Sequence, residues 1–137
     1  MIMTEEQKDL KDLLLKDLCA RLPYGVKVRY SSYEKFITCT LHAINPVYHI
    51  VDLWSENACF NPVDTSKIKP YLFPLSSMTD AEKEEYCQLQ QRVIYNSKGS
   101  VNEDVTKYIN WCYKKHLDIN NLIPMDLAID ATGLNIY

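Results

Sequence analysis

The 137-residue sequence predicts a single α+β domain, and its length suits one domain. Three helix-start signals precede segments whose apolar residues recur at helical spacing. Between the first and second of these signals, residues 26–53 are rich in alternating polar and apolar residues, which is typical of half-buried strands. We therefore expect an N-terminal helix, a small antiparallel sheet of three or four strands, and two further helices packed on one face of that sheet.

The first helix is predicted from Thr4 to about Arg21. Thr4-Glu5-Glu6-Gln7 forms a capping box, in which the side chains of the first and last residue each satisfy a free backbone N–H. Apolar residues at helical spacing form one stripe: Leu10, Leu13, Leu14, Leu18 and Leu22. Charged residues, Asp17 among them, are expected on the solvated side. Pro23 and Gly25 end the helix.

Three strands are predicted next, at Val26–Tyr30, Phe36–Ile44 and Val47–Leu53. An even-length loop centred on Asn45-Pro46 would place Ile44 opposite Val47, His42 opposite His49 and Cys39 opposite Asp52 in the last two strands. One face of this hairpin then consists of Ile37, Cys39, Leu41 and Ala43 with Tyr48, Ile50, Asp52 and Trp54. We expect that face to be the core face.

The middle of the chain changes character twice. Residues 55–67 are predicted to be a loop with a turn at Asn61-Pro62. Residues 68–75 contain two prolines and four large apolar residues, which predicts a rigid extended strap lying across the core. A second capping box, Thr79-Asp80-Ala81-Glu82, then begins a helix to about Val93. This helix has few apolar positions, so it should be the most exposed of the three.

A break at residues 96–99 and a third capping box at Ser100-Val101-Asn102-Glu103 predict the last helix. Its apolar stripe is Val101, Val105, Tyr108, Ile109 and Cys112. Leu127-Ala128-Ile129 is predicted to be a short strand added to one edge of the sheet.

Two phrases and a turn give the chain a resemblance to a known group of proteins. Lys69 to Thr79 reads KPYLFPLSSMT, Leu22 to Val26 reads LPYGV, and the C-terminal region carries Leu122-Ile123-Pro124 and Leu127-Ala128-Ile129. These motifs resemble those of small uncharacterised proteins of gut-bacterial phages and mobile elements. The resemblance covers both ends and the middle of the chain, and it implies no particular chemistry.

Composition limits the function. The net charge of −3 argues against non-specific nucleic-acid binding, which requires a basic surface. No apolar run is long enough to cross a bilayer, and the N-terminus lacks a signal-peptide pattern, so no membrane contact is expected. Five cysteines without a CxxC pair indicate reduced, mostly buried thiols and a cytoplasmic location. Only three glycines are present, which argues against a glycine-rich phosphate loop.

Two pairs of residues suggest a metal site or a catalytic site, and each pair lacks a further residue that such a site requires. His42 and His49, if paired across two strands, supply two imidazoles, whereas zinc requires at least one more protein ligand. Cys112 and His116 stand four residues apart on a predicted helix, but no third group orients them. No metal or other cofactor is predicted, and the balance favours a protein that is not an enzyme.

The candidate binding residues form one basic and aromatic patch and one helix end: Tyr24, Lys27, Arg29, Tyr30, Tyr33, Lys114 and Lys115. An ordinary solvated strand face is the favoured explanation of the patch, and the preference for cations at helix C-termini is the favoured explanation of the helix end. Ten tyrosines are more than usual and suit an interface. The sequence, with the resemblance, predicts a non-enzymatic accessory protein that binds and inhibits a host defence or regulatory protein. A nucleotide binder, a small Cys/His hydrolase and a homodimer joined through a strand edge remain open alternatives.

Overall fold

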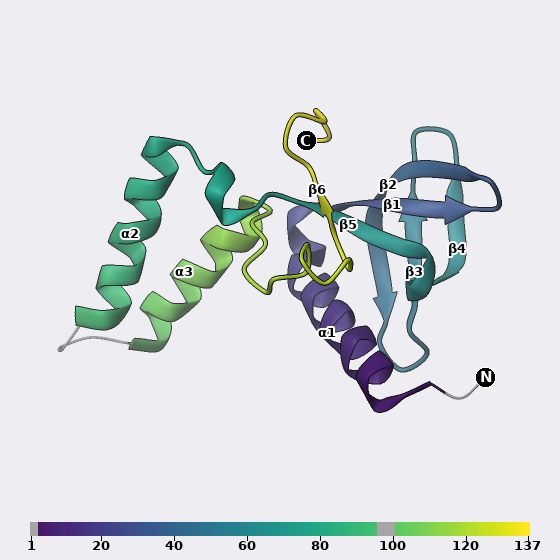
Figure 1. The fold of residues 1–137 in the computed structure, drawn as a ribbon, viewed down its shortest axis with the longest axis horizontal. Coiled ribbons are helices and arrows are strands. Elements are labelled where there is room, and N and C mark those ends of the chain that lie inside the picture. Colours follow the sequence, from purple (N-terminus) through teal and green to yellow (C-terminus); the bar gives the residue numbers. More distant parts are fainter. Residues whose placement is uncertain (1–2, 96–100) are drawn as a thin grey trace.

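The helices of this protein begin where the capping signals in the sequence predict them. The computed structural model describes residues 3–95 and 101–137 (Figure 1). Its helices are α1 (Glu5–Arg21), α2 (Asp80–Tyr95) and α3 (Val101–Lys114). The Thr4 hydroxyl accepts the Gln7 N–H at 3.1 Å, and Glu82 accepts the Thr79 N–H at 3.0 Å. The predicted break at residues 96–99 and the predicted cap at Ser100 lie outside the described residues.

The sheet has more strands than the sequence predicted. The described residues contain β1 (Lys27–Ser32), β2 (Lys35–Asn45), β3 (Ile50–Trp54), β4 (Cys59–Asp64), β5 (Ile68–Leu72) and β6 (Ile129–Asp130). They form one sheet in the order β4-β3-β2-β1-β5-β6, in which only the β5–β6 pair is parallel. The prediction of three or four strands was wrong because the expected loop of residues 55–67 contains β4. The expected strap contains β5.

The strap of residues 68–75 covers the core as an ordinary strand of the sheet. Pro70 lies opposite Val28 of β1, and the side chains of Ile68 and Leu72 are almost completely buried. Two residues of the C-terminal segment, Ile129 and Asp130, then pair with the other edge of β5. The predicted short strand near Leu127–Ile129 therefore exists, displaced by about one residue in chain position.

The register predicted for the β2–β3 hairpin was wrong. Ile44 lies opposite Val51, and Ala43 lies opposite Asp52, with a bulge between Leu41 and Ala43. The Asn45 side chain accepts the N–H groups of Val47 and Tyr48, so a longer turn replaces the predicted tight one. The shift of four residues in the turn would by itself keep the predicted faces, but the one extra residue at the bulge reverses the faces of β3 relative to Leu41. Val51 and Leu53 are buried and Trp54 is half exposed, the opposite of the prediction.

A single apolar core joins α1 to one face of the sheet. Leu14 and Leu18 of α1 pack with Val28, Leu41 and Leu53 from the central strands. All five side chains are at most 5% exposed. The predicted apolar stripe of α1 is therefore confirmed at these positions.

Asp17 was predicted on the solvated side of α1, but it is completely buried. Its carboxylate accepts the Arg21 Nε–H at 2.6 Å, and Arg21 also donates to the Leu117 carbonyl at 2.7 Å. Asn120 donates to the same carboxylate at 2.8 Å. These contacts tie the end of α1 to the segment that follows α3. A charge pattern alone could not reveal them, because the partner residues are about 100 positions away.

The prediction that α2 and α3 pack on one face of the sheet was wrong. They form an antiparallel hairpin that extends to the side of the sheet, and α3 approaches α1 (Figure 1). One sheet face is already covered by α1, and the strand residues of the other face are largely polar. No side chain of α2 is fully buried.

Candidate binding face

The outer face of the sheet, opposite α1, carries the candidate site. Side chains alternate between the two faces of a strand, so residues adjacent to the buried Val28 and Cys39 point outward. On this face Arg29 of β1 lies opposite Thr38 of β2 on one side and Lys69 of β5 on the other. The antiparallel ladder therefore brings basic residues together from strands that lie far apart in the sequence.

Two exposed aromatic side chains border these cations. The Phe36 side chain of β2 is 69% exposed, and that of Trp54, opposite Thr40, is 49% exposed. His42 stacks on Trp54 with ring centroids 3.6 Å apart. We refer to Lys27, Arg29, Phe36, Trp54 and Lys69 as the basic–aromatic face.

Most of the positive charge on this face has no carboxylate partner. Lys69 binds Asp126 at 2.9 Å, and this hydrogen bond, with Arg29 nearby, lowers the pKa of Asp126 below its ordinary value. Lys27 and Arg29 form no ion pair with any residue that the structure describes. The Arg29 guanidinium instead lies 4.2 Å from the centre of the Phe36 ring, and its Nε has no hydrogen-bond partner.

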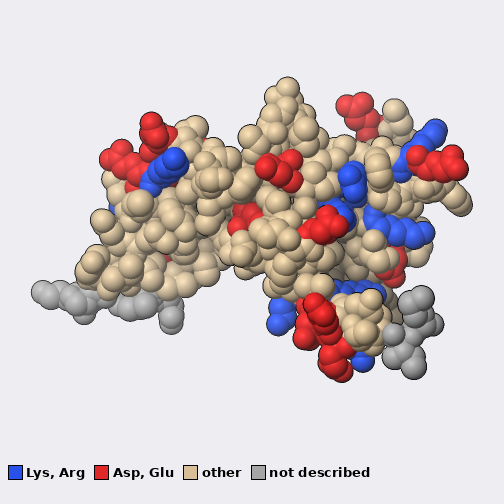
Figure 2. Space-filling view, viewed as in Figure 1, with Lys and Arg blue, Asp and Glu red and all other residues tan. Residues whose placement is uncertain are grey.

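The space-filling view agrees with this distribution. More Lys and Arg side chains are visible over the sheet and α1, on the right of the picture, than on the α2–α3 side, and Asp and Glu side chains lie among them (Figure 2). The chain is acidic overall, with a net charge of −3. Lys27, Arg29 and Lys69 thus form a local cluster of cations on an acidic protein.

The structure brings only two of the predicted binding residues together, namely Lys27 and Arg29. Tyr30 points into the protein and packs against Phe60, with ring centroids 5.1 Å apart. Tyr33 is fully exposed at the tip of the β1–β2 hairpin. Tyr24 lies half-buried in the 3₁₀ turn that follows α1. Of these tyrosines, only Tyr33 is freely accessible.

The predicted helix-end cations lie elsewhere. Lys114 is the last residue of α3, and Lys115 follows it directly. Both are exposed, and the Lys115 ammonium sits 6.0 Å from the centre of the Trp111 ring. Because they belong to the α2–α3 side of the molecule, they do not extend the basic–aromatic face.

Sequence reasoning missed Phe36, Trp54 and Lys69 as surface residues. Phe36 shares the period-2 pattern of Thr38 and Thr40, so correct alternation along β2 identifies it. Trp54 was assigned to the core face because the hairpin register was wrong. Lys69 was passed over because its segment was interpreted as a strap, and nothing local signals that β5 pairs with β1.

The histidine pair does not assemble as predicted. His42 stacks on Trp54, while His49 lies in the turn before β3 with a positive φ of 53°. In the described residues no group of three or more His, Cys, Asp and Glu side chains is placed to hold a metal ion.

Cys112 and His116 do not form a reactive pair. Burial raises the pKa of Cys112 to about 11, whereas a nucleophilic cysteine requires a lowered pKa. The helix α3 ends at Lys114, so His116 does not share its face. Burial and the nearby Arg21 lower the pKa of His116 to about 4.

The expectation of mostly buried thiols was wrong. All five cysteines are free, but only Cys39 and Cys112 are buried. The other three are exposed: Cys19, Cys59 and Cys87. Cys19 lies on the exposed side of α1, and Cys87 lies on the exposed side of α2. The cysteine count alone does not show on which side of a helix a cysteine lies.

Comparisons with known proteins give no functional information, so any functional conclusion rests on the fold and the basic–aromatic face. No family model matches the chain, and neither the curated proteins nor the solved structures contain a significant match. Within residues 3–95 and 101–137, no helix combines the length and the apolar character needed to cross a membrane.

Proposed function

We propose that this chain is a non-enzymatic binding protein whose basic–aromatic face docks on an acidic surface of a partner protein. One observation supports this most directly: Arg29 and Lys27 have no carboxylate partner among the described residues and are bordered by the exposed rings of Phe36 and Trp54. Trp, Tyr and Arg are the residues most often responsible for affinity in protein interfaces. Exposed apolar groups next to charged ones are typical of such surfaces.

The charge of this face favours an acidic partner. A desolvated guanidinium requires a complementary carboxylate, and opposite potentials also accelerate association. The resemblance to proteins of phages and mobile elements suggests that the partner is a host defence or regulatory protein, which this chain would inhibit by occupying its surface. That identity depends on the resemblance alone.

The second candidate ligand for the same face is a single-stranded nucleic acid or a nucleotide. Exposed rings beside cations can stack bases and neutralise phosphates. The three cations Lys27, Arg29 and Lys69 are few for this purpose, and one of them is already paired with Asp126. The net negative charge of the chain further weakens long-range attraction to phosphate.

Quantitative capture from lysates of gut bacteria tests the proposal. The tagged protein is compared with Arg29→Glu and Trp54→Ala, while Lys83→Glu and Tyr95→Ala on α2 serve as controls with the same change of charge or ring loss. Lys83 and Tyr95 are both exposed. We expect one protein to be retained by the wild type and both controls and to be lost, by roughly tenfold or more, from both face variants. Circular dichroism checks that every variant folds.

Two results would overturn the proposal. One is a captured protein that both face variants retain as well as the wild type does. The other is tight binding of an oligothymidine probe, measured by fluorescence anisotropy, that Arg29→Glu and Trp54→Ala abolish. The second result would assign the face to single-stranded nucleic acid.

A further inference from the structure

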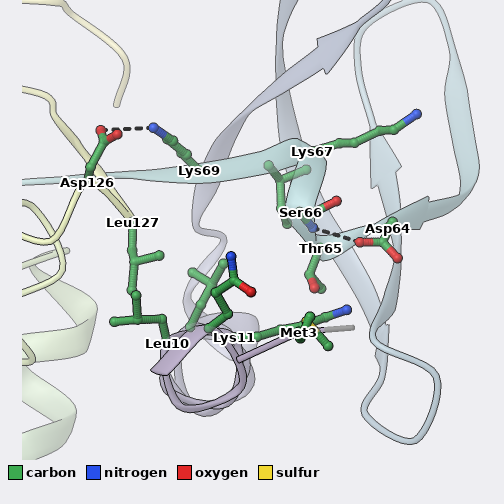
Figure 3. A pocket seen from close by; sticks show the side chains of 13 residues that line it. Met3, Leu10, Lys11, Asp64, Thr65, Ser66, Lys67, Lys69, Asp126 and Leu127 are labelled. Atoms are coloured by element: carbon green, nitrogen blue, oxygen red, sulfur yellow. Dashed lines mark hydrogen bonds and ion pairs between the residues drawn. The ribbon is translucent and has the colours of Figure 1, made fainter. Parts of the chain in front are cut away.

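A cavity of about 740 Å³ lies between α1 and the turn that joins β4 to β5. No described residue of α3 lines it. The turn is the 3₁₀ helix η2 (Thr65–Lys67), and Asp126 with Leu127 closes a third side (Figure 3). Pockets for small molecules usually measure about 300–1,000 Å³, so this cavity is large enough for one ligand.

One part of the cavity wall is apolar. Leu10 and Leu14 of α1, Ile68 of β5 and Leu127 line it. Leu14 and Ile68 also belong to the protein core, so this wall rests on a packed layer. A hydrocarbon chain or ring placed against it would be removed from water at little cost in ordering the protein.

The polar part of the cavity contains a buried hydroxyl group without a partner. Thr65 is 1% exposed, and its Oγ1 forms no hydrogen bond. Its side chain points from η2 towards α1 and Lys11 (Figure 3). A buried hydroxyl without a partner is destabilising, and a ligand oxygen in the cavity would accept its hydrogen.

The lysines around the cavity include two without ion pairs. Lys11 and Lys67 form no ion pair with any described residue. Asp126 binds Lys69 at 2.9 Å, and Asp64 accepts the Ser66 N–H at 2.9 Å. Burial alone would raise the pKa of Asp64, but this hydrogen bond and, after it, the nearby Lys11 charge lower that pKa. The three lining lysines, Lys11, Lys67 and Lys69, exceed the two lining carboxylates by one positive charge, so the Lys11 ammonium and the Thr65 hydroxyl at the polar end suit an anion.

We infer that this cavity binds a small amphipathic anion, with an apolar chain along Leu10 and Leu127 and a carboxylate or phosphate head at Lys11 and Thr65. A charge-assisted hydrogen bond from the lysine would fix the head group, and the apolar wall would supply most of the affinity. Neither Lys11 nor Thr65 belongs to the basic–aromatic face. Failure of this inference and failure of the proposed docking function can thus be distinguished.

Isothermal titration calorimetry with decanoate and with decyl phosphate tests this inference, and decan-1-ol serves as the uncharged probe. We expect at least one of the two anions, decanoate or decyl phosphate, to bind with one molecule per chain. That anion should bind more tightly than the alcohol. The preferred head group identifies the ligand class. Lys11→Gln should weaken the binding roughly tenfold to a hundredfold, as expected for a lost charge-assisted hydrogen bond. Lys16→Gln, which removes an exposed charge from the same helix, should leave binding unchanged.

Thr65→Val provides a second test, in which weaker binding cannot be explained by a loss of protein stability. This change removes an unpartnered hydroxyl at nearly constant volume, so the free protein should be as stable as the wild type or more stable. Binding of the anion should nevertheless weaken. Absence of saturable binding by either anion at millimolar concentration, or equal binding by wild type, Lys11→Gln and Thr65→Val, would overturn the inference.

Discussion

The sheet with α1 and the α2–α3 hairpin are stabilised in different ways. In the sheet, the core is dry and aliphatic: Leu18, Val28 and Leu53 are fully buried. In the hairpin, no residue of α2 is buried, and the two helices meet through aromatic rings with polar groups. Tyr86 and Tyr108 lie 5.6 Å apart by ring centroid, and their hydroxyl groups hydrogen-bond at 3.0 Å.

This difference explains the use of two of the ten tyrosines, Tyr86 and Tyr108. Aliphatic residues suffice where two layers exclude water completely. A two-helix hairpin excludes less water, so a ring that packs on one side and hydrogen-bonds at its tip suits it better. Burial, together with the bond to Tyr86, accordingly raises the pKa of Tyr108. The hairpin should therefore depend strongly on its attachment to the rest of the protein.

The largest expected effect is at that attachment. Asp17→Ala would leave the fully buried Arg21 guanidinium without its carboxylate and remove the acceptor for Asn120. Breaking a buried ion pair in this way destabilises a protein by about 3–5 kcal/mol. Urea denaturation followed by circular dichroism measures the loss. Asp12→Ala, which removes an exposed carboxylate from the same helix, should change the free energy of unfolding by about 0.5 kcal/mol or less.

A loss below about 1 kcal/mol for Asp17→Ala would mean that Arg21 is adequately solvated without its partner. The junction between α1 and the segment after α3 would then depend mainly on apolar contacts.

An intermediate, pH-dependent effect is expected at His116, which lies where α3 joins the rest of the protein. Its ring stacks on Tyr137, and its carbonyl accepts the Phe73 N–H. Burial and the nearby Arg21 lower its pKa from 6.5 to about 4 in the folded protein. Between these values the unfolded chain binds a proton that the folded chain does not. The free energy of unfolding should therefore fall as the pH is lowered from 6.5 towards 4, and this contribution is complete above 6.5.

Urea titrations over this pH range, repeated on His116→Asn, isolate the contribution. Asparagine tolerates the positive φ of 58° at this position, so the backbone is preserved. The variant should lose part of the slope of stability against pH. Identical slopes for the variant and the wild type would show that other groups cause the acid sensitivity.

The smallest expected effect tests the hydrogen-bonded rings directly. Tyr108→Phe keeps the ring but removes the hydroxyl that donates to Tyr86 and accepts from Gln90. We expect a loss of about 1 kcal/mol, because a typical hydrogen bond contributes that much net stability. Hydrogen exchange should accelerate in α2 and α3 more than in β3. Tyr95→Phe, on an exposed ring of α2, is the matched control and should change neither quantity.

Much of the fold could be predicted where neighbouring residues decide the structure. The capping boxes at Thr4 and Thr79 begin α1 and α2, because each uses groups only three residues apart. The outward position of Arg29 follows from the alternation along β1. These features depend on contacts that a short window of sequence contains.

The candidate site could be predicted only in part. Lys27 and Arg29 were identified from their own strand. Trp54 belongs to a strand whose pairing was predicted in the wrong register, and Lys69 belongs to a strand whose pairing with β1 was not predicted. The β2–β3 register depends on a bulge and on the Asn45 side chain capping a longer turn. A shift of one residue exchanges the two faces of a strand, so a bulge that the sequence does not reveal moves residues between core and surface.

The sequence by itself determined the helices, the exposed character of α2 and the extended character of residues 68–75, since helix caps, periodicity and proline act locally. Only the tertiary structure decided that this extended segment pairs with β1, that the Asp17–Arg21 pair is buried against Leu117 and Asn120, and that cations from β1 and β5 meet beside two exposed rings. Each of these outcomes joins residues distant in the chain. Their free energy comes from burial and pairing that exist only once the sheet has formed.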